Sequence, residues 1–214
     1  VYMHACEEGQ EITDEQPEQW VRSAIGDDTP FKIVHTDRWS MSAQVAQHFR
    51  DGRIFLAGDA AHRFPPTGGM GMNTGMQDVF NLCWKIARVV NGTSAVALLD
   101  SYEHERRPSV ERNCEQSRVN FQKMSQVEEA IGISSSVEKT RENLNLLDID
   151  DTHSQQRRER IQQSIDAQRD HFFMLGMDLG VCYDGALIQT CPEEAPQNNY
   201  RASEYNPSSA AGNR

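Results

Sequence analysis

One segment of this chain places a carboxylate, two prolines and four glycines between an apolar run and a helical pattern. Its sequence is GDAAHRFPPTGGMGMN, from Gly58 to Asn73. Glycines where a helix begins leave backbone N–H groups open to a ligand, and the helix end carries partial positive charge. Loops of about fifteen residues in a compact domain usually either bind a ligand or lack order. Because Pro65 and Pro66 stiffen this one, it predicts a site for an anion or for an oxygen with partial negative charge.

Two common phosphate-binding motifs do not fit this segment. No Lys-Ser or Lys-Thr follows the glycines, as a Walker A loop requires, and Thr74 stands where GxGxxG needs its third glycine. Asp59 would repel a phosphate, but it is suited to accept a hydrogen bond from a polyol hydroxyl. A cofactor with a polyol chain and a head group that gains negative charge satisfies both ends of the loop. Reduced flavin meets that description.

A longer stretch, from Gly52 to Pro108, carries a family resemblance. The sequence GRIFLAGDAAHRFPPTGGMGMNTGMQDVFNLCWKIARVVNG…LLDSYEHERRP resembles the second flavin-binding segment of the FAD-dependent aromatic hydroxylases. These are class A flavoprotein monooxygenases of the phenol and para-hydroxybenzoate hydroxylase type. The chain is most similar to the chlorophenol and phenol monooxygenases and to the polyketide hydroxylases, and a weaker likeness continues to HFFMLGMDLGVCYDGA. The resemblance implies hydroxylation of a phenol-like compound with FAD, NAD(P)H and O2.

The resemblance also implies roles for individual residues. Asp59 would bind the ribityl chain of FAD, and the backbone N–H groups of Met72 and Asn73 would face the flavin C2 carbonyl. Pro66 would be the catalytic position, beside the isoalloxazine edge where oxygen reacts. The remaining cofactor-binding positions, where the cofactor would approach the backbone closely, are Gly58, Gly68, Gly69 and Gly71.

Parts of the family pattern do not occur in this sequence. The strand-GxGxxG-helix motif for the ADP half of FAD is missing, and so is a middle motif with a second Asp-Gly pair. We therefore interpret the chain as an internal or C-terminal fragment that is inactive alone. Two alternatives stay open: an incomplete, FAD-free piece that only associates with other chains, and a polyketide hydroxylase or epoxidase of the same fold.

The fold class that follows is an α/β fragment of mixed α+β character. The resemblance implies part of an FAD/NAD(P)-binding three-layer fold of the para-hydroxybenzoate hydroxylase type, with a helical C-terminal half. We expect residues 1–50 to end a substrate-domain sheet and 51–131 to complete an FAD-binding domain. Residues 132–190 would form a helical extension, and 191–214 a linker toward a missing third domain.

Hydrophobic periodicity and turn residues predict the elements that position the loop. The expected strands are 1–6, 31–41 and 53–58, with a helical turn at 43–49. The expected helices are 14–25, 74–90, 94–106, 108–131 and 155–176. Residues 53–58 form an apolar run that is typical of a strand buried on both faces of a sheet. Thr13 with Gln16, and Thr74 with Gln77, are predicted capping boxes, and Pro108 is predicted to break a helix or begin one.

Composition narrows the choice of partners. A net charge of −11 without a basic stripe argues against nucleic acid and anionic membranes, and no apolar run approaches a membrane span. We expect a cytoplasmic protein with a small-molecule partner, able to form a homodimer. The five cysteines show no CxxC spacing and the histidines no helical metal pair, so we expect reduced thiols and no metal.

The remaining polar and aromatic residues receive mostly structural interpretations. His62 is expected to be a structural histidine that is hydrogen-bonded to backbone. Met70, Met76 and Trp84 are expected in the core, on a helix buried all around, while Met72 stays open to a flavin-contacting role. The charged residues of YEHERRP are expected on a solvated helix face: Glu103, Glu105, Arg106 and Arg107. His35 and Trp39 are weaker candidates to line an aromatic pocket.

Overall fold

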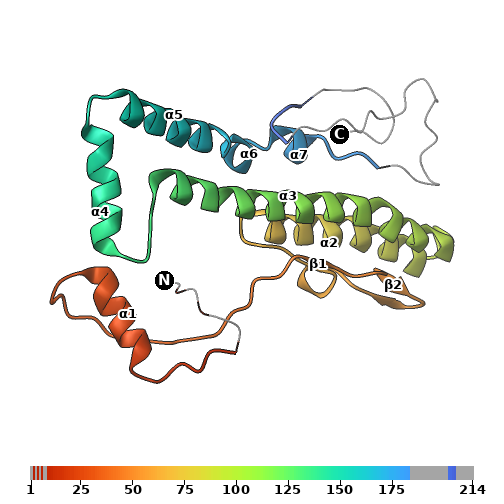
Figure 1. Cartoon of the computed structure of the whole chain (residues 1–214). Helices are drawn as coiled ribbons and strands as arrows, with labels where there is room; N and C mark the ends of the chain where they lie inside the picture. Colours follow the sequence, from red (N-terminus) through yellow and green to blue (C-terminus); the bar gives the residue numbers. More distant parts are fainter. Residues whose placement is uncertain (1, 3, 5, 7–8, 184–201, 206–214) are drawn as a thin grey trace. The chain divides into compact units, whose positions relative to one another are not determined.

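The computed structural model describes residues 2, 4, 6, 9–183 and 202–205 (Figure 1). The chain divides into two units, residues 1–40 and 41–214. The four segments expected from the sequence, with boundaries after residues 50, 131 and 190, stay a prediction. Half of the strand expected at residues 1–6 and most of the linker expected at 191–214 lie outside the described residues.

The first unit contains one helix, α1 (Gln16–Ile25), in its described part. Gln16 accepts a hydrogen bond from the Thr13 N–H at 2.9 Å, which is one half of the predicted capping box. Gly26 ends the helix at a φ of 77°, and its N–H donates to the Arg22 carbonyl. The strand predicted at residues 31–41 is wrong: all these residues are described, and none is in a strand. No described strand pairs with them.

Two antiparallel pairs of very short strands open the second unit. β1 (Gln44–Val45) pairs with β4 (His62–Arg63), and β2 (Arg50–Asp51) pairs with β3 (Ile54–Phe55). The strand expected at 53–58 is therefore only two residues long, and Ile54 is 69% exposed rather than buried in a sheet. The helical turn expected at 43–49 is also wrong, because Gln44 and Val45 form a strand there.

Two long helices, α2 (Met70–Val90) and α3 (Ser101–Ile131), pack side by side (Figure 1). α2 begins four residues earlier than predicted: Gly69 precedes it at a φ of 63°, and Thr74 lies inside it, donating to the Met70 carbonyl. Between them lies a 3-10 turn, η2 (Val96–Asp100). The break predicted at Pro108 is wrong, since α3 continues through it. Residues on both sides of Pro108 are buried where α3 packs on α2, and this packing offsets the missing N–H.

Shorter helices follow the long pair. α4 (Val137–Asn145) is capped by Ser136, and η3 (Leu146–Asp148) leads to α5 (Thr152–Asp166), which Asp151 caps. α5 packs along α3, and the chain continues through α6 (Arg169–Phe172) and α7 (Leu175–Leu179). The helical pattern predicted for 155–176 is thus divided between three helices. None of the helices within the described ranges is both long and apolar enough to cross a membrane.

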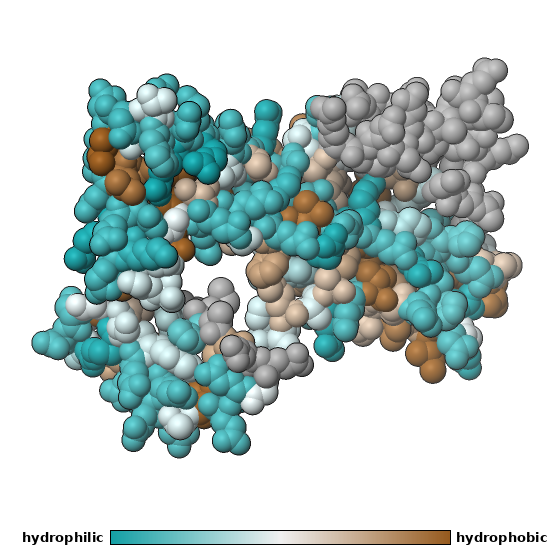
Figure 2. Space-filling model, in the orientation of Figure 1, coloured by the Kyte–Doolittle hydropathy of each residue, from teal (hydrophilic) through white to brown (hydrophobic). Residues whose placement is uncertain are grey.

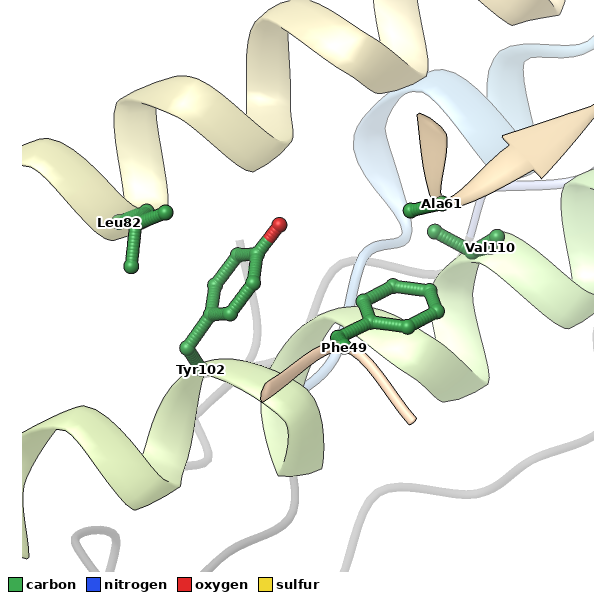
Figure 3. Packing of buried hydrophobic residues seen from close by; sticks show 5 residues of the cluster. All are labelled: Phe49, Ala61, Leu82, Tyr102 and Val110. Atoms are coloured by element: carbon green, nitrogen blue, oxygen red, sulfur yellow. The ribbon is translucent and has the colours of Figure 1, made fainter. Parts of the chain in front are cut away.

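The main apolar core lies between α2, α3 and the strands (Figure 3). Phe49 and Tyr102 are fully buried, with ring centroids 6.1 Å apart, and the Tyr102 hydroxyl donates to the Leu56 carbonyl. A second, smaller cluster joins Met70 to Met177 and Ala202. The core therefore fixes both the start of α2 and the segment that leads into it.

α2 does not bury its apolar residues as predicted. Its buried residues are mostly polar: Met70, Thr74, Asp78, Asn81, Leu82 and Lys85. Its exposed large apolar residues are Met72, Met76, Val79, Phe80, Trp84 and Val90. Hydrophobic patches therefore interrupt the mostly hydrophilic surface around α2 and the short strands (Figure 2). Only Met70 of the residues expected in the core is buried, and Met72 is 75% exposed.

Candidate functional site

The loop after β3 folds back onto the first turns of α2. The 3-10 turn η1 (Gly58–Ala60) contacts this helix, and Gly58 adopts a φ of 56°, which favours glycine. A Cβ added to Gly75 would lie 3.2 Å from the Gly58 Cα. The two glycines thus allow the turn and the helix to approach more closely than larger residues would permit.

A pocket of about 450 Å³ opens where η1 meets α2. Its lining residues are Ala57, Gly58, Asp59, Gly71, Met72, Gly75, Met76 and Val79. Four residues expected at a site from the sequence are therefore brought together: Gly58, Asp59, Gly71 and Met72. The other four, Pro66, Gly68, Gly69 and Asn73, are not among the lining residues.

The pocket combines one carboxylate with an apolar wall. Asp59 is exposed, and its carboxylate has no hydrogen-bond partner among the residues that the structure describes. Met72, Met76 and Val79 follow one another at helical spacing along the exposed face of α2. The arrangement suits a ligand with hydroxyl donors at one end and a flat apolar body at the other.

The N-terminus of α2 contributes unpaired backbone donors. Because α2 begins at Met70, regular helical register leaves the N–H groups of Met70, Gly71 and Met72 without a helical carbonyl. The same register pairs the Asn73 N–H with the Gly69 carbonyl, which also accepts a hydrogen bond from the Asn73 side chain at 3.1 Å. Of these three residues, Gly71 and Met72 also line the pocket.

The two glycines before α2 shape the turn into the helix. Gly68 and Gly69 have φ angles of 83° and 63°, in the region that other residues rarely adopt. A Cβ on Gly68 would lie 2.9 Å from the Met70 Cε, whereas the Cβ position on Gly69 is open. Pro66 is exposed, between the buried residues Pro65 and Thr67. These residues aim the helix end and present Pro66 at the surface.

Behind the pocket lies a buried polar network that the sequence reasoning missed. Asp78 is fully buried, and one carboxylate oxygen accepts from the His62 Nε2 at 2.7 Å and from the Gly58 N–H at 3.2 Å. Its other oxygen accepts from the Arg106 Nε at 2.9 Å. Burial alone would raise the pKa of Asp78, but these hydrogen bonds and the Arg106 charge outweigh it and lower the pKa. The carboxylate therefore stays ionised behind the pocket.

A second buried ion pair lies farther along α2. Lys85 and Asn81 both donate to Glu105 Oε2 at 2.7 Å. Burial lowers the pKa of Lys85 and outweighs the opposing effect of its partner Glu105. The solvated face predicted for YEHERRP is thus wrong for Glu105 and Arg106, which are buried against α2.

His62 also departs from its expected partner. It is buried and structural, but it bonds the Asp78 carboxylate rather than backbone, and its ring stacks on Phe64. A polar stripe at helical spacing, Asp78, Asn81 and Lys85, is the sequence signal that could have identified the network. Such a stripe in an otherwise apolar helix indicates a buried polar face as readily as a solvated one.

The other candidates are not among the residues that line the pocket. His35 and Trp39 are exposed residues of the first unit and belong to no strand. Cys6, Cys83, Cys114 and Cys182 form no disulfide in the described part of the chain, and Cys191 is outside the described residues. Burial raises the pKa of the Cys114 thiol, which disfavours a reactive thiolate. In the described part of the chain, no cluster of His, Cys, Asp or Glu could hold a metal ion.

Comparisons of sequence and structure relate this chain to flavin-binding proteins. Residues 1–117 match the sequence model of a family described as an FAD binding domain. A 2,4-dichlorophenol 6-monooxygenase of Cupriavidus pinatubonensis is 33% identical over 181 residues, which are 83% of this chain and 30% of the relative. A putative polyketide hydroxylase of Streptomyces coelicolor is 47% identical over 103 residues, which are 48% of this chain and 16% of the relative.

A solved structure matches nearly the whole chain. The crystal structure of the flavin-dependent monooxygenase PieE, in complex with FAD and substrate, aligns with a TM-score of 0.87 at 26% identity. The alignment covers 98% of this chain and 37% of PieE. The chain therefore spans about a third or less of the length of these relatives. The expected fold class is confirmed as part of a flavoprotein monooxygenase fold, here rich in helices and poor in strands.

Proposed function

This chain belongs to the FAD-binding domain family, and we propose that its pocket holds the flavin end of FAD within an NAD(P)H-dependent aromatic monooxygenase. The observation that carries the proposal is the pocket itself. It joins the free Asp59 carboxylate, the unpaired N–H groups of Gly71 and Met72, and an apolar wall on α2.

The residues present fit the proposed cofactor. The Asp59 carboxylate accepts hydrogen bonds from ribityl hydroxyls. The N–H groups of Gly71 and Met72, with the positive end of α2, would stabilise the part of the flavin ring that gains negative charge on reduction. Gly71 lines the pocket, and a Cβ added there would meet only Phe64 Cδ2, at 4.0 Å, so protein atoms leave the space beside it open.

Loop residues outside the pocket take supporting roles. Gly68 and Gly69 set the direction of α2 through their left-handed backbone, and Asn73 closes its first turn on Gly69. Pro66, which is exposed, would lie beside the flavin edge and shape the space for the aromatic substrate. FAD supplies the redox chemistry, in which NAD(P)H is the reductant and O2 the source of the oxygen transferred to the ring.

The substrate class follows from the relatives. A phenol-like compound fits the likeness to a dichlorophenol monooxygenase over most of the chain. A polyketide is the second candidate, because the similarity to a putative polyketide hydroxylase is higher over a shorter stretch. The chain by itself covers too little of these relatives for us to expect activity, so the proposal concerns the protein that contains it.

The test uses the purified protein that contains this chain. We expect it to bind FAD, to oxidise NADPH or NADH faster when phenol or 2,4-dichlorophenol is added, and to form the hydroxylated ring. Faster oxidation only with a fused-ring aromatic polyketide would favour the second candidate. Failure to bind added FAD would refute the proposal, and light scattering on the same sample tests the expected homodimer.

A matched pair of variants tests the pocket. Asp59→Asn removes a charged acceptor and is expected to weaken FAD binding by about 10- to 100-fold. Asp51→Asn changes an exposed carboxylate of the β2–β3 hairpin and is expected to leave FAD binding unchanged. Equal FAD dissociation constants for the two variants would contradict the role of Asp59.

A further inference from the structure

The segment around Pro66 alternates sharply in burial. Pro65 and Thr67 are buried, with Thr67 only 6% exposed, whereas Pro66 between them is exposed. Because this segment has no described strand partner, its buried backbone groups need hydrogen-bond partners elsewhere in the protein. The described contacts show that α3 provides them.

One buried serine of α3 meets the backbone on both sides of Pro66. The Ser117 hydroxyl lies 2.6 Å from the Pro65 carbonyl oxygen and 3.1 Å from the Thr67 carbonyl oxygen. A hydroxyl has a single proton, so Ser117 donates mainly to the nearer Pro65 carbonyl and only weakly to the farther Thr67 carbonyl. Ser117 is fully buried, which excludes water as a ready substitute for the hydroxyl.

Thr67 returns the contact. Its hydroxyl donates to the Ser117 carbonyl at 2.6 Å. Without Thr67, this carbonyl would accept hydrogen bonds only from within α3. The two hydroxyls lie 3.2 Å apart, so the loop and the helix are joined at both a serine and a threonine. The Gly69 N–H then closes the turn on the Pro66 carbonyl at 3.3 Å.

We propose that Ser117 is a positioning residue for Pro66. It holds the carbonyls on both sides of this proline, so that the ring and carbonyl of Pro66 stay in one place at the reacting edge of the site. The proposal rests on the proposed function for the identity of that edge. The hold on the loop itself is independent of the cofactor.

The first measurement therefore needs no cofactor. In the protein that contains this chain, Ser117→Ala and Ser125→Ala are compared by hydrogen–deuterium exchange of peptides that cover residues 64–70. Ser125 lies on the same helix but is exposed, and within the described ranges its hydroxyl donates only to the Gln122 carbonyl of its own helix. We expect exchange at the Gly69 amide to rise about tenfold in Ser117→Ala, the effect of one lost buried hydrogen bond on local opening. Exchange in Ser125→Ala should match the unchanged protein.

The second measurement separates positioning from stability. With FAD bound, Ser117→Ala should keep its FAD dissociation constant within about twofold while product formed per NAD(P)H consumed falls several-fold. Thr67→Val removes the hydrogen bond from the Thr67 hydroxyl to the Ser117 carbonyl and should show the same pattern. Thr67→Ser keeps that hydroxyl and should retain the product yield of the unchanged protein.

The outcomes are distinguishable. Unchanged loop exchange, or unchanged product yield in a protein that hydroxylates normally, would overturn the role of Ser117. A loss of FAD binding in step with global unfolding would also overturn it, since that is the behaviour of a merely structural hydroxyl. If the protein without any substitution binds no FAD, the proposed function fails, and the assignment of Pro66 to a reacting edge fails with it.

Discussion

Arg106 of α3 donates from its Nε to Asp78 Oδ1 of α2 at 2.9 Å, and both side chains are fully excluded from solvent. The same Asp78 accepts from His62 and from the Gly58 N–H, so one carboxylate joins both long helices to the start of the candidate flavin loop. A buried pair of this kind is costly to break, because either partner alone becomes an uncompensated charge.

Arg106→Leu is therefore expected to be strongly destabilising. It leaves the Asp78 carboxylate buried with His62 as its remaining side-chain partner, and we expect the free energy of unfolding in urea to fall by about 3–5 kcal/mol. Arg107→Leu is the control, since the Arg107 side chain pairs with Glu111 at 3.1 Å and both side chains are partly exposed. That change should cost less than about 1 kcal/mol. Similar losses of unfolding free energy in the two variants would show that the buried pair contributes no more to stability than the exposed one.

Gly75→Ala tests the close approach of α2 to the Gly58 turn. The added Cβ would lie 3.2 Å from the Gly58 Cα, so the turn must shift, at an expected cost of about 1–3 kcal/mol. Gly71→Ala meets no such obstacle, and its higher helix propensity should leave stability unchanged or up to about 1 kcal/mol greater.

FAD titration of the same two variants adds a second comparison. Gly71 lines the pocket, so Gly71→Ala should weaken FAD binding even though the protein stays stable. Gly75→Ala should lower both the stability of the protein and its affinity for FAD. A stable Gly75→Ala variant would show that the turn moves freely and that the glycine contact does not constrain the site.

Glu103 predicts a dependence of stability on pH. Burial acts to raise its pKa, but hydrogen bonds from the Phe49 N–H and from His48 outweigh burial and hold the pKa below its ordinary value of 4.5. As the pH falls below about 4.5, the unfolded chain takes up a proton that the folded protein does not yet bind. The group therefore stabilises the fold above this pH and loses that contribution as the pH falls through the folded pKa, with a slope of at most about 1.4 kcal/mol per pH unit.

Urea unfolding at a series of pH values checks this expectation. Glu103→Gln should show a smaller decline of unfolding free energy below pH 4.5 than the unchanged protein. Glu128→Gln, an exposed change on the same helix, should decline as the unchanged protein does. Parallel curves for all three proteins would rule out the contribution of Glu103.

Pro66→Ala separates oxygen transfer from cofactor binding. The side chain is exposed and outside the pocket lining, so we expect the FAD dissociation constant to change less than about twofold. A loosened loop misplaces the reacting edge, and the product formed per NAD(P)H consumed should fall about tenfold. Asp59→Asn should show the opposite pattern, with weak FAD binding and normal yield once FAD is saturating. A Pro66→Ala protein that loses FAD instead would place this proline in the cofactor site.

The local character of the loop could be predicted from the sequence. Glycines and prolines act through their own backbone angles, and the start of a helix creates unpaired N–H groups whatever surrounds it. Asp59 and Gly71 could therefore be assigned to a ligand site from their types and spacing, whereas Gly58 and Met72 were added by the family resemblance. The folded chain places all four around one pocket. The exact start of α2 could not be predicted, because Thr74 serves equally well as a cap or, as here, as a buried hydroxyl bonded within the helix.

Tertiary structure alone decided which faces are covered and which charges meet. The apolar pattern of α2 shows where its hydrophobic residues lie but not which side packs on α3, and the packed side proved to be the polar one. Asp78 and Arg106 are 28 positions apart, and only the register between two helices brings them together. Backbone conformation and the donors at a helix start depend on neighbouring residues, whereas burial and ion pairing depend on contacts between segments that are distant in the chain.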